Sequence, residues 1–88
     1  MLILIRDDAS NYGSDVAVTE AALAEVRYKF NPSGLPTVDR LKIVAAAFLA
    51  VCDEVAVANP VAGRELALAK TNMQQASMWA VSGATKGL

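Results

Sequence analysis

The sequence predicts an all-α protein: an antiparallel two-helix hairpin preceded by an N-terminal arm and assembled as an oligomeric helical bundle. Of its 88 residues, 55% are hydrophobic but only 6% are aromatic, and Ala is the commonest residue, which is typical of tightly packed helices. Residues 37–58 and 63–85 carry apolar side chains at alternating spacings of three and four, which is helical periodicity. The short Pro- and Gly-containing connection between them predicts an antiparallel pair.

The chain divides at residues 31–36, where two prolines and a glycine preclude a continuous helix. Residues 1–30 are the predicted arm and residues 31–88 the helical-hairpin domain. Within the arm, residues 2–5 favour a strand, residues 11–14 a turn, and Thr19 can cap a helix from Glu20 to about Arg27. Because the arm has little apolar periodicity, we expect it to pack on the rest of the chain or on another subunit.

The first long helix is expected to begin with Thr37 as its N-cap and to end at Asn59-Pro60, because Pro cannot donate to the helical ladder. Its apolar seam consists of Val38, Leu41, Ala45, Phe48, Cys52 and Val55.

The second helix is expected from Gly63 or Arg64 to about Thr85, before Gly87. Four of its six seam residues are small, so we expect the two helices to approach closely. This seam consists of Leu66, Ala69, Met73, Ala76, Ala80 and Gly83.

Apolar side chains also lie off both seams, and a hairpin by itself would leave them exposed. A helix that is apolar around most of its circumference is buried on more than one side, so the chain is expected to form oligomers. The off-seam residues are Ile43, Val44, Leu49 and Val51 on the first helix and Leu68, Met78, Trp79 and Val81 on the second.

Composition and charge exclude several classes of function. There is no His and a single Cys, so a zinc site, a His-based catalyst and an internal disulfide are excluded, and we expect no enzyme, no metal and no cofactor. The longest strongly apolar uncharged run, residues 43–52, is too short to cross a bilayer, and we expect a cytoplasmic protein with Cys52 reduced. Residues 1–26 carry a net charge of −4 and residues 27–88 of +3, which suits a small anionic ligand better than DNA.

The candidate binding residues are Tyr28, Phe30, Asn31, Lys42 and Arg64. An aromatic ring can stack on a base, and the cations can meet phosphates, Lys42 from the flank of the interface and Arg64 near a helix N-terminus. Each has an alternative interpretation. The aromatic residues could plug the open end of the hairpin above a simple turn, and both cations could be surface residues that pair with carboxylates.

Three stretches of the sequence together resemble the helical-hairpin domain of phage anti-defence sponge proteins, which sequester the cyclic-nucleotide signals of CBASS and Thoeris immunity. The resemblance covers about residues 27–88. The first stretch joins an aromatic-x-Pro turn to a basic residue in the first helix, and the last ends in Ala-x-Met-Trp-Ala. The stretches are Phe30-Asn31-Pro32-Ser33-Gly34 with Val38-Asp39-Arg40-Leu41-Lys42, then Gly63-Arg64-Glu65-Leu66-Ala67-Leu68-Ala69-Lys70-Thr71, and Ala76-Ser77-Met78-Trp79-Ala80-Val81.

The resemblance implies a dimer or trimer of dimers that binds cyclic di- and possibly trinucleotides between subunits, in an infected bacterial host cell, without cleaving them. It implies that Tyr28 or Phe30 stacks on a base, that Lys42 holds a phosphate, and that Arg64 serves a second pocket for trinucleotides. No counterpart to the arm is recognised. The alternatives, in order, are a phage assembly protein without a ligand and a DNA- or RNA-binding protein.

Overall fold

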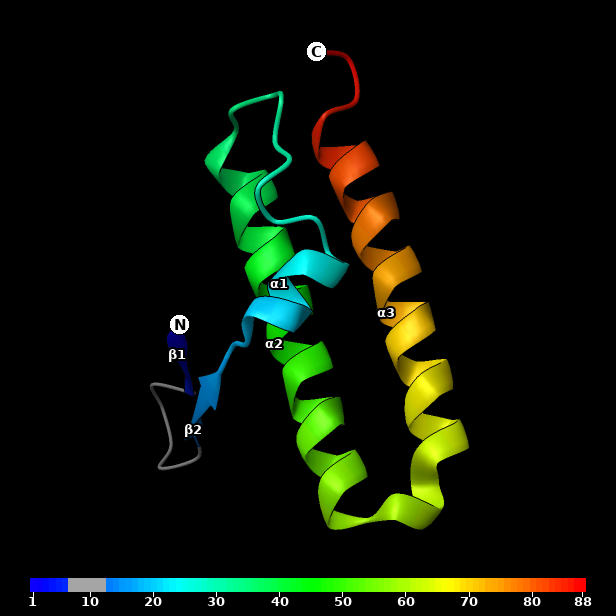
Figure 1. The fold of residues 1–88 in the computed structure, drawn as a ribbon. Helices are drawn as coiled ribbons and strands as arrows, with labels where there is room; N and C mark the ends of the chain where they lie inside the picture. The colour runs from blue at the N-terminus through cyan, green and yellow to red at the C-terminus, as the bar shows by residue number, and fades with distance from the viewer. Residues whose placement is uncertain (7–12) are drawn as a thin grey trace.

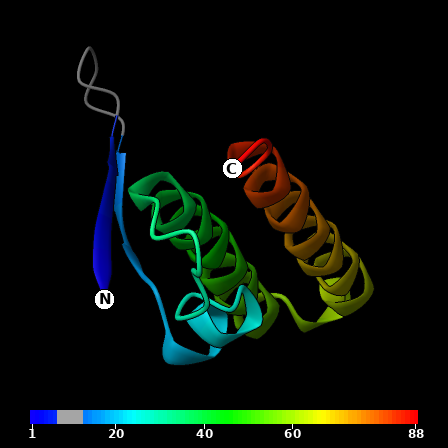
Figure 2. The ribbon, with the colours of Figure 1, turned by 90° about the horizontal axis from the view of Figure 1, so that it is seen from above.

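A computed structural model describes residues 1–6 and 13–88 of the chain. Two long helices form a hairpin, and a small arm packs beside one of them (Figures 1 and 2). The arm includes a two-stranded antiparallel sheet, so the protein is mostly helical but the all-α prediction was incomplete. The elements are β1 (Leu2–Arg6), β2 (Gly13–Ala17), α1 (Glu20–Glu25), α2 (Pro36–Ala58), the 3-10 turn η1 (Pro60–Ala62) and α3 (Gly63–Ala84).

The hairpin forms much as its sequence predicts, with one error at the start of α2. The helix begins at Pro36, Leu35 is the N-cap, and no side chain caps it, so the prediction of Thr37 as N-cap was wrong. Pro is favoured in the first turn because its fixed φ is already helical and its missing N–H has no partner there in any case. Helix α2 ends before Asn59, and α3 begins at Gly63, as predicted.

The arm combines a β-ribbon with one short helix. The Thr19 Oγ1 accepts a hydrogen bond from the Ala22 N–H at 3.1 Å, which confirms the predicted cap. Helix α1 ends at Glu25, earlier than expected, and Arg27 adopts a left-handed conformation with φ of 56°. The turn predicted at residues 11–14 lies partly outside the described residues, and Gly13 and Ser14 belong instead to strand β2, which the sequence did not predict.

The core lies between the arm and α2 (Figures 1 and 2), and Met73 of α3 packs against it. Leu49 is fully buried there, although it was expected to be exposed in an isolated hairpin. The arm thus packs on the rest of the chain and covers an apolar face that the periodicity left open. This core is formed by Val16, Val18, Ala22, Leu23 and Val26 of the arm and by Ala45, Ala46, Ala47, Leu49 and Ala50 of α2.

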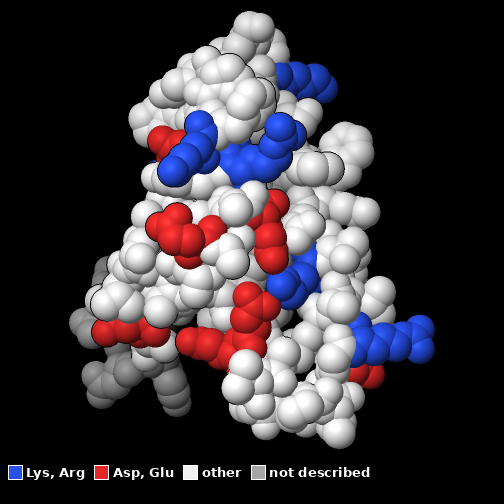
Figure 3. Space-filling model, in the orientation of Figure 1, with Lys and Arg blue, Asp and Glu red and all other residues white. Residues whose placement is uncertain are grey.

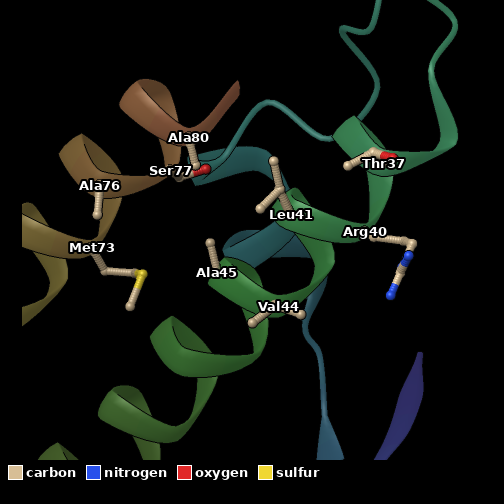
Figure 4. A pocket seen from close by; sticks show the side chains of 9 residues that line it. All are labelled: Thr37, Arg40, Leu41, Val44, Ala45, Met73, Ala76, Ser77 and Ala80. Atoms are coloured by element: carbon tan, nitrogen blue, oxygen red, sulfur yellow. The ribbon is translucent and has the colours of Figure 1, made fainter. Parts of the chain in front are cut away.

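The contact between α2 and α3 is looser than predicted. Phe48 is 43% exposed and Val55 is also exposed, so their placement on a buried seam was wrong, whereas Cys52 is buried as expected. Ser77 is the one buried residue of α3. Small side chains on α3 leave a groove of about 420 Å³ between the helices, into which Met73 extends (Figure 4). Within residues 1–6 and 13–88, no helix is long and apolar enough to span a membrane.

Candidate functional site

The candidate site is a cavity of about 600 Å³ at the end of the molecule where the connection before α2 meets the end of α3. Its size is within the range of small-molecule pockets. The antiparallel hairpin creates it, because the C-terminal turns of α3 return beside the N-terminal turns of α2 (Figure 1). Its lining is formed by Phe30, Asn31, Pro32, Ser33, Leu35, Val38 and Lys42 from one side and by Val81, Thr85 and Leu88 from the other.

Phe30 is the aromatic residue of this cavity, and its side chain is 58% exposed. Two cations lie near its ring. The guanidinium carbon of Arg27 is 5.0 Å from the ring centre, and the ammonium nitrogen of Lys42 is 5.8 Å from it. Both distances are within the range of cation–π attraction. An exposed aromatic face with positive charge on its flank can accept a stacked base and an anionic group together.

Lys42 is 6% exposed, and its ammonium group is directed toward the backbone of its own chain. It donates hydrogen bonds to the Arg27 carbonyl at 2.8 Å and to the Phe30 carbonyl. Burial lowers the pKa of Lys42, the charge of Arg27 lowers it further, and Asp39 raises it. We expected Lys42 at the flank of a subunit interface. In this chain it fixes the segment that carries Phe30, including the left-handed conformation of Arg27.

Asn31 closes the turn before α2. Its side-chain amide donates to the Leu35 carbonyl at 3.0 Å and to Asp39 Oδ1 at 3.1 Å, and its oxygen accepts from the Ser33 hydroxyl at 2.7 Å. Gly34 completes the turn with φ of 69°, a conformation that favours glycine. The polar atoms of Asn31 are therefore engaged within the turn.

Tyr28 and Arg64 do not share this cavity. Tyr28 is half-buried against the core and lines a different cavity, of about 400 Å³, beside α1. Arg64 is exposed in the first turn of α3, at the opposite end of the hairpin (Figure 1). The structure thus brings together Phe30, Asn31 and Lys42 of the five candidate residues and separates the other two.

The five candidate binding residues did not include Arg27 or the residues of the far wall of the cavity. The far wall is formed by Val81, Thr85 and Leu88. The antiparallel hairpin was itself predicted, and residues near the end of its second helix must lie beside the start of its first. The sequence therefore carried the signal for the far wall, whereas nothing local indicated that Arg27 would lie over the Phe30 ring.

Charge is unevenly distributed around the site. On the face in Figure 3, Lys and Arg side chains form a band across the upper part of the molecule, and acidic side chains gather below it. One cation, Lys70, is engaged among these acids, with Nζ 2.8 Å from Asp53 Oδ1 and 3.3 Å from Glu25 Oε1. The hydrogen bond to Asp53 is the main cause of its raised pKa. This cluster joins all three helices.

Metal chemistry has no support in the described residues, where no group of three or more His, Cys, Asp and Glu side chains could hold an ion. The candidate site combines an aromatic ring, two cations, a closed turn and apolar walls, a set of groups whose chemistry suits a small anionic molecule with a flat apolar part.

Comparison with known proteins identifies the family. No curated protein and no solved structure matches the chain. Residues 20–85 match the hairpin domain of Acb2/Tad1, which covers α1, both long helices and the whole connection that carries Phe30. The chain therefore belongs to the Acb2/Tad1 hairpin-domain family, the anti-CBASS and anti-Thoeris sponge family, whose members sequester cyclic nucleotides.

Proposed function

We propose that this protein is a phage sponge that binds cyclic oligonucleotide immune signals in an infected bacterial cell and holds them without cleavage. The observation that carries the proposal is the exposed ring of Phe30, flanked by Arg27 and Lys42 at the mouth of a cavity, in a chain of the sponge family. Sequestration needs affinity and abundance rather than an acid, a base or a metal.

In the proposed complex, a base of a cyclic dinucleotide stacks on Phe30, and Arg27 pairs with a phosphate. Arg27 suits the phosphate because its side chain is exposed and a guanidinium can form two parallel hydrogen bonds to phosphate oxygens. Lys42 adds positive charge 5.8 Å from the ring centre, although two of its N–H groups already donate to backbone carbonyls. Asn31 keeps the turn in place beside the ligand.

Arg64 is proposed to serve a second, separate pocket for cyclic trinucleotides. It lies in the first turn of α3, where backbone N–H groups and the helix dipole favour an anion. Its distance from Phe30 along the hairpin (Figure 1) means that the two pockets would fill independently.

We propose that the protein works as a homo-oligomer, a dimer or a trimer of dimers, with ligand bound between subunits. The chain exposes 6301 Å², whereas a monomeric protein of 9.2 kDa is expected to expose about 4,900 Å². The surplus exceeds the roughly 800 Å² that one partner contributes to a standard interface. Large apolar side chains on both long helices are among the exposed residues, namely Val44, Phe48, Val51 and Val55 on α2 and Leu68, Met78 and Trp79 on α3.

Calorimetric titration with a panel of cyclic di- and trinucleotides tests the proposal. We expect Phe30→Ala to weaken dinucleotide binding by about 1–3 kcal/mol through lost stacking. The control, Arg40→Ala, removes an exposed cation of α2 that is not among the residues lining the candidate cavity, and it is expected to leave the affinity unchanged. Arg64→Ala is expected to weaken trinucleotides alone.

Two outcomes would contradict the proposal. A panel without any binding would favour a phage assembly protein that uses its apolar faces for structure alone. Linear or monomeric nucleotides recovered by chromatography after heat denaturation of the complex would mean that the protein cleaves its ligand.

A further inference from the structure

Strand β1 has an open edge. It pairs with β2 with Ile3 opposite Val16 and Leu4 opposite Asp15. Just beyond the ribbon, the Met1 carbonyl accepts from the Val18 N–H at 2.6 Å and the Met1 nitrogen donates to the Val18 carbonyl at 3.3 Å. Hydrogen-bonded pairs alternate along an antiparallel ladder, so Ile3 also faces β2. The N–H and C=O groups of Leu2 and Leu4 therefore point away from β2.

The side chains of Leu2 and Leu4 are also exposed to solvent. Leu2 is 72% exposed and Leu4 is 55% exposed, while Ile3, on the other face, packs against the core. Ala17 and Asp15 lie beside the two leucines on the same outer face. Leu2 and Leu4 thus combine an apolar side chain in water with backbone groups that no strand among the described residues satisfies.

An open edge of this kind fits another β-strand. A two-stranded ribbon is marginally stable by itself, and native edge strands are usually protected by charges, prolines or bulges. Residues 1–5 contain no charged side chain and no proline. Arg6, at the end of β1, is the one charged residue of this strand, so the Leu2–Leu4 stretch of the edge lacks the usual features that keep a second strand away.

We propose that β1 pairs edge to edge with β1 of a second copy of this chain, antiparallel about a two-fold axis, with Leu2 opposite Leu4 of the other copy. A strand edge offers alternating donors and acceptors, so it complements itself in this orientation. A two-fold axis closes the contact, whereas pairing of unlike edges would give rings or open filaments. This register places Leu2 of each copy opposite Leu4 of the other. A register shifted by two residues would instead put Leu2 opposite Arg6. This contact is independent of ligand binding.

Amide hydrogen exchange on the unmodified protein tests the contact directly. As protein concentration rises through the range where copies associate, exchange at the Leu2 and Leu4 amides is expected to slow by about tenfold or more. The Ile3 amide faces β2 within one copy and is the internal control, because its protection should not depend on concentration. Exchange at Leu2 and Leu4 that stays unprotected when association is complete would overturn the proposal.

Cross-linking tests the register. In this register, the Cα atom of Leu2 in one copy and the Cα atom of Leu4 in the other would lie about 5.5 Å apart, which a disulfide can bridge. The cysteine variants are made in a Cys52→Ala background. A mixture of the Leu2→Cys and Leu4→Cys variants should give several times more cross-linked dimer than either variant does alone. Equal yields from the mixture and the single variants would refute this register.

Two further variants separate edge pairing from packing of the outer face. Leu4→Lys places a charge on the open edge and is expected to lower the mass of the assembly in sedimentation. Ala17→Lys places the same charge on the same face but on β2, and the mass should stay unchanged. If both variants or neither lowers the mass, edge pairing is refuted, and circular dichroism of each variant confirms that the helices persist.

Discussion

Replacing Lys42 by Met is expected to destabilise the protein, because this ammonium holds two backbone carbonyls. Met keeps most of the apolar stem but removes the donors, and hydrogen bonds to a charged group contribute about 1.5–3 kcal/mol. The carbonyls of Arg27 and Phe30 would lose this partner. We expect the free energy of unfolding to fall by about 1.5–3 kcal/mol, which lowers the urea midpoint by about 1–2 M.

Urea denaturation at one fixed protein concentration measures this effect. The matched control is Lys29→Met, which makes the same change at an exposed lysine nearby and is expected to shift stability by less than about 0.5 kcal/mol. Sequence reasoning alone predicts that loss of Lys42 weakens ligand binding and leaves folding intact. If Lys42→Met were as stable as the control, Lys42 would not hold the turn, and the assignment from geometry would be wrong.

Two substitutions and one chemical modification test the core, the ion cluster and the buried thiol. Leu49→Ala should cost about 2–5 kcal/mol in urea denaturation, because the arm buries Leu49 completely, whereas the exposed Val57→Ala should cost less than about 0.5 kcal/mol. The pKa of Lys70 is raised above 10.5. Its contribution to stability is therefore complete below pH 10.5 and is lost as the pH rises through the folded-state pKa. The free energies of unfolding of wild type and Lys70→Met should converge in that alkaline range. Cys52 is buried and its thiol pKa is raised by burial, so iodoacetamide should react with it only at the rate of unfolding. Equal costs at Leu49 and Val57, a constant Lys70 difference across alkaline pH, or rapid alkylation would each contradict this account.

The sequence predicted the hairpin well because its signals are local. Prolines and glycines mark the ends of α2 and α3, and helical periodicity needs no knowledge of distant residues. Strand β2 was missed because its sequence, Gly-Ser-Asp-Val-Ala, has low β-propensity. It forms through pairing with β1, and such a contact between distant segments leaves no periodic signal of its own.

Burial was harder to predict than helix position. Periodicity placed Leu49 off the seam but could not reveal that the arm covers it. Phe48 was placed on the seam, but the core lies between the arm and α2 and leaves Phe48 exposed. Lys42 offered a usable signal, because it shares a helix face with Val38, Ala45 and Leu49, all of which are buried. A lysine within an apolar face needs a partner for its ammonium group. The nearby segment before α2 supplies that partner through its carbonyls.

The cavity has walls from the two ends of the hairpin, residues 30–42 and residues 81–88. Its far wall is the last turn of α3 and the residues after it, where helices fray most readily. Each fraying event would remove Val81, Thr85 and Leu88 from the cavity without unfolding the rest of the chain. The rate at which a bound molecule leaves could therefore be set by melting of this single turn, and occupancy of the cavity would in return slow amide exchange at the end of α3.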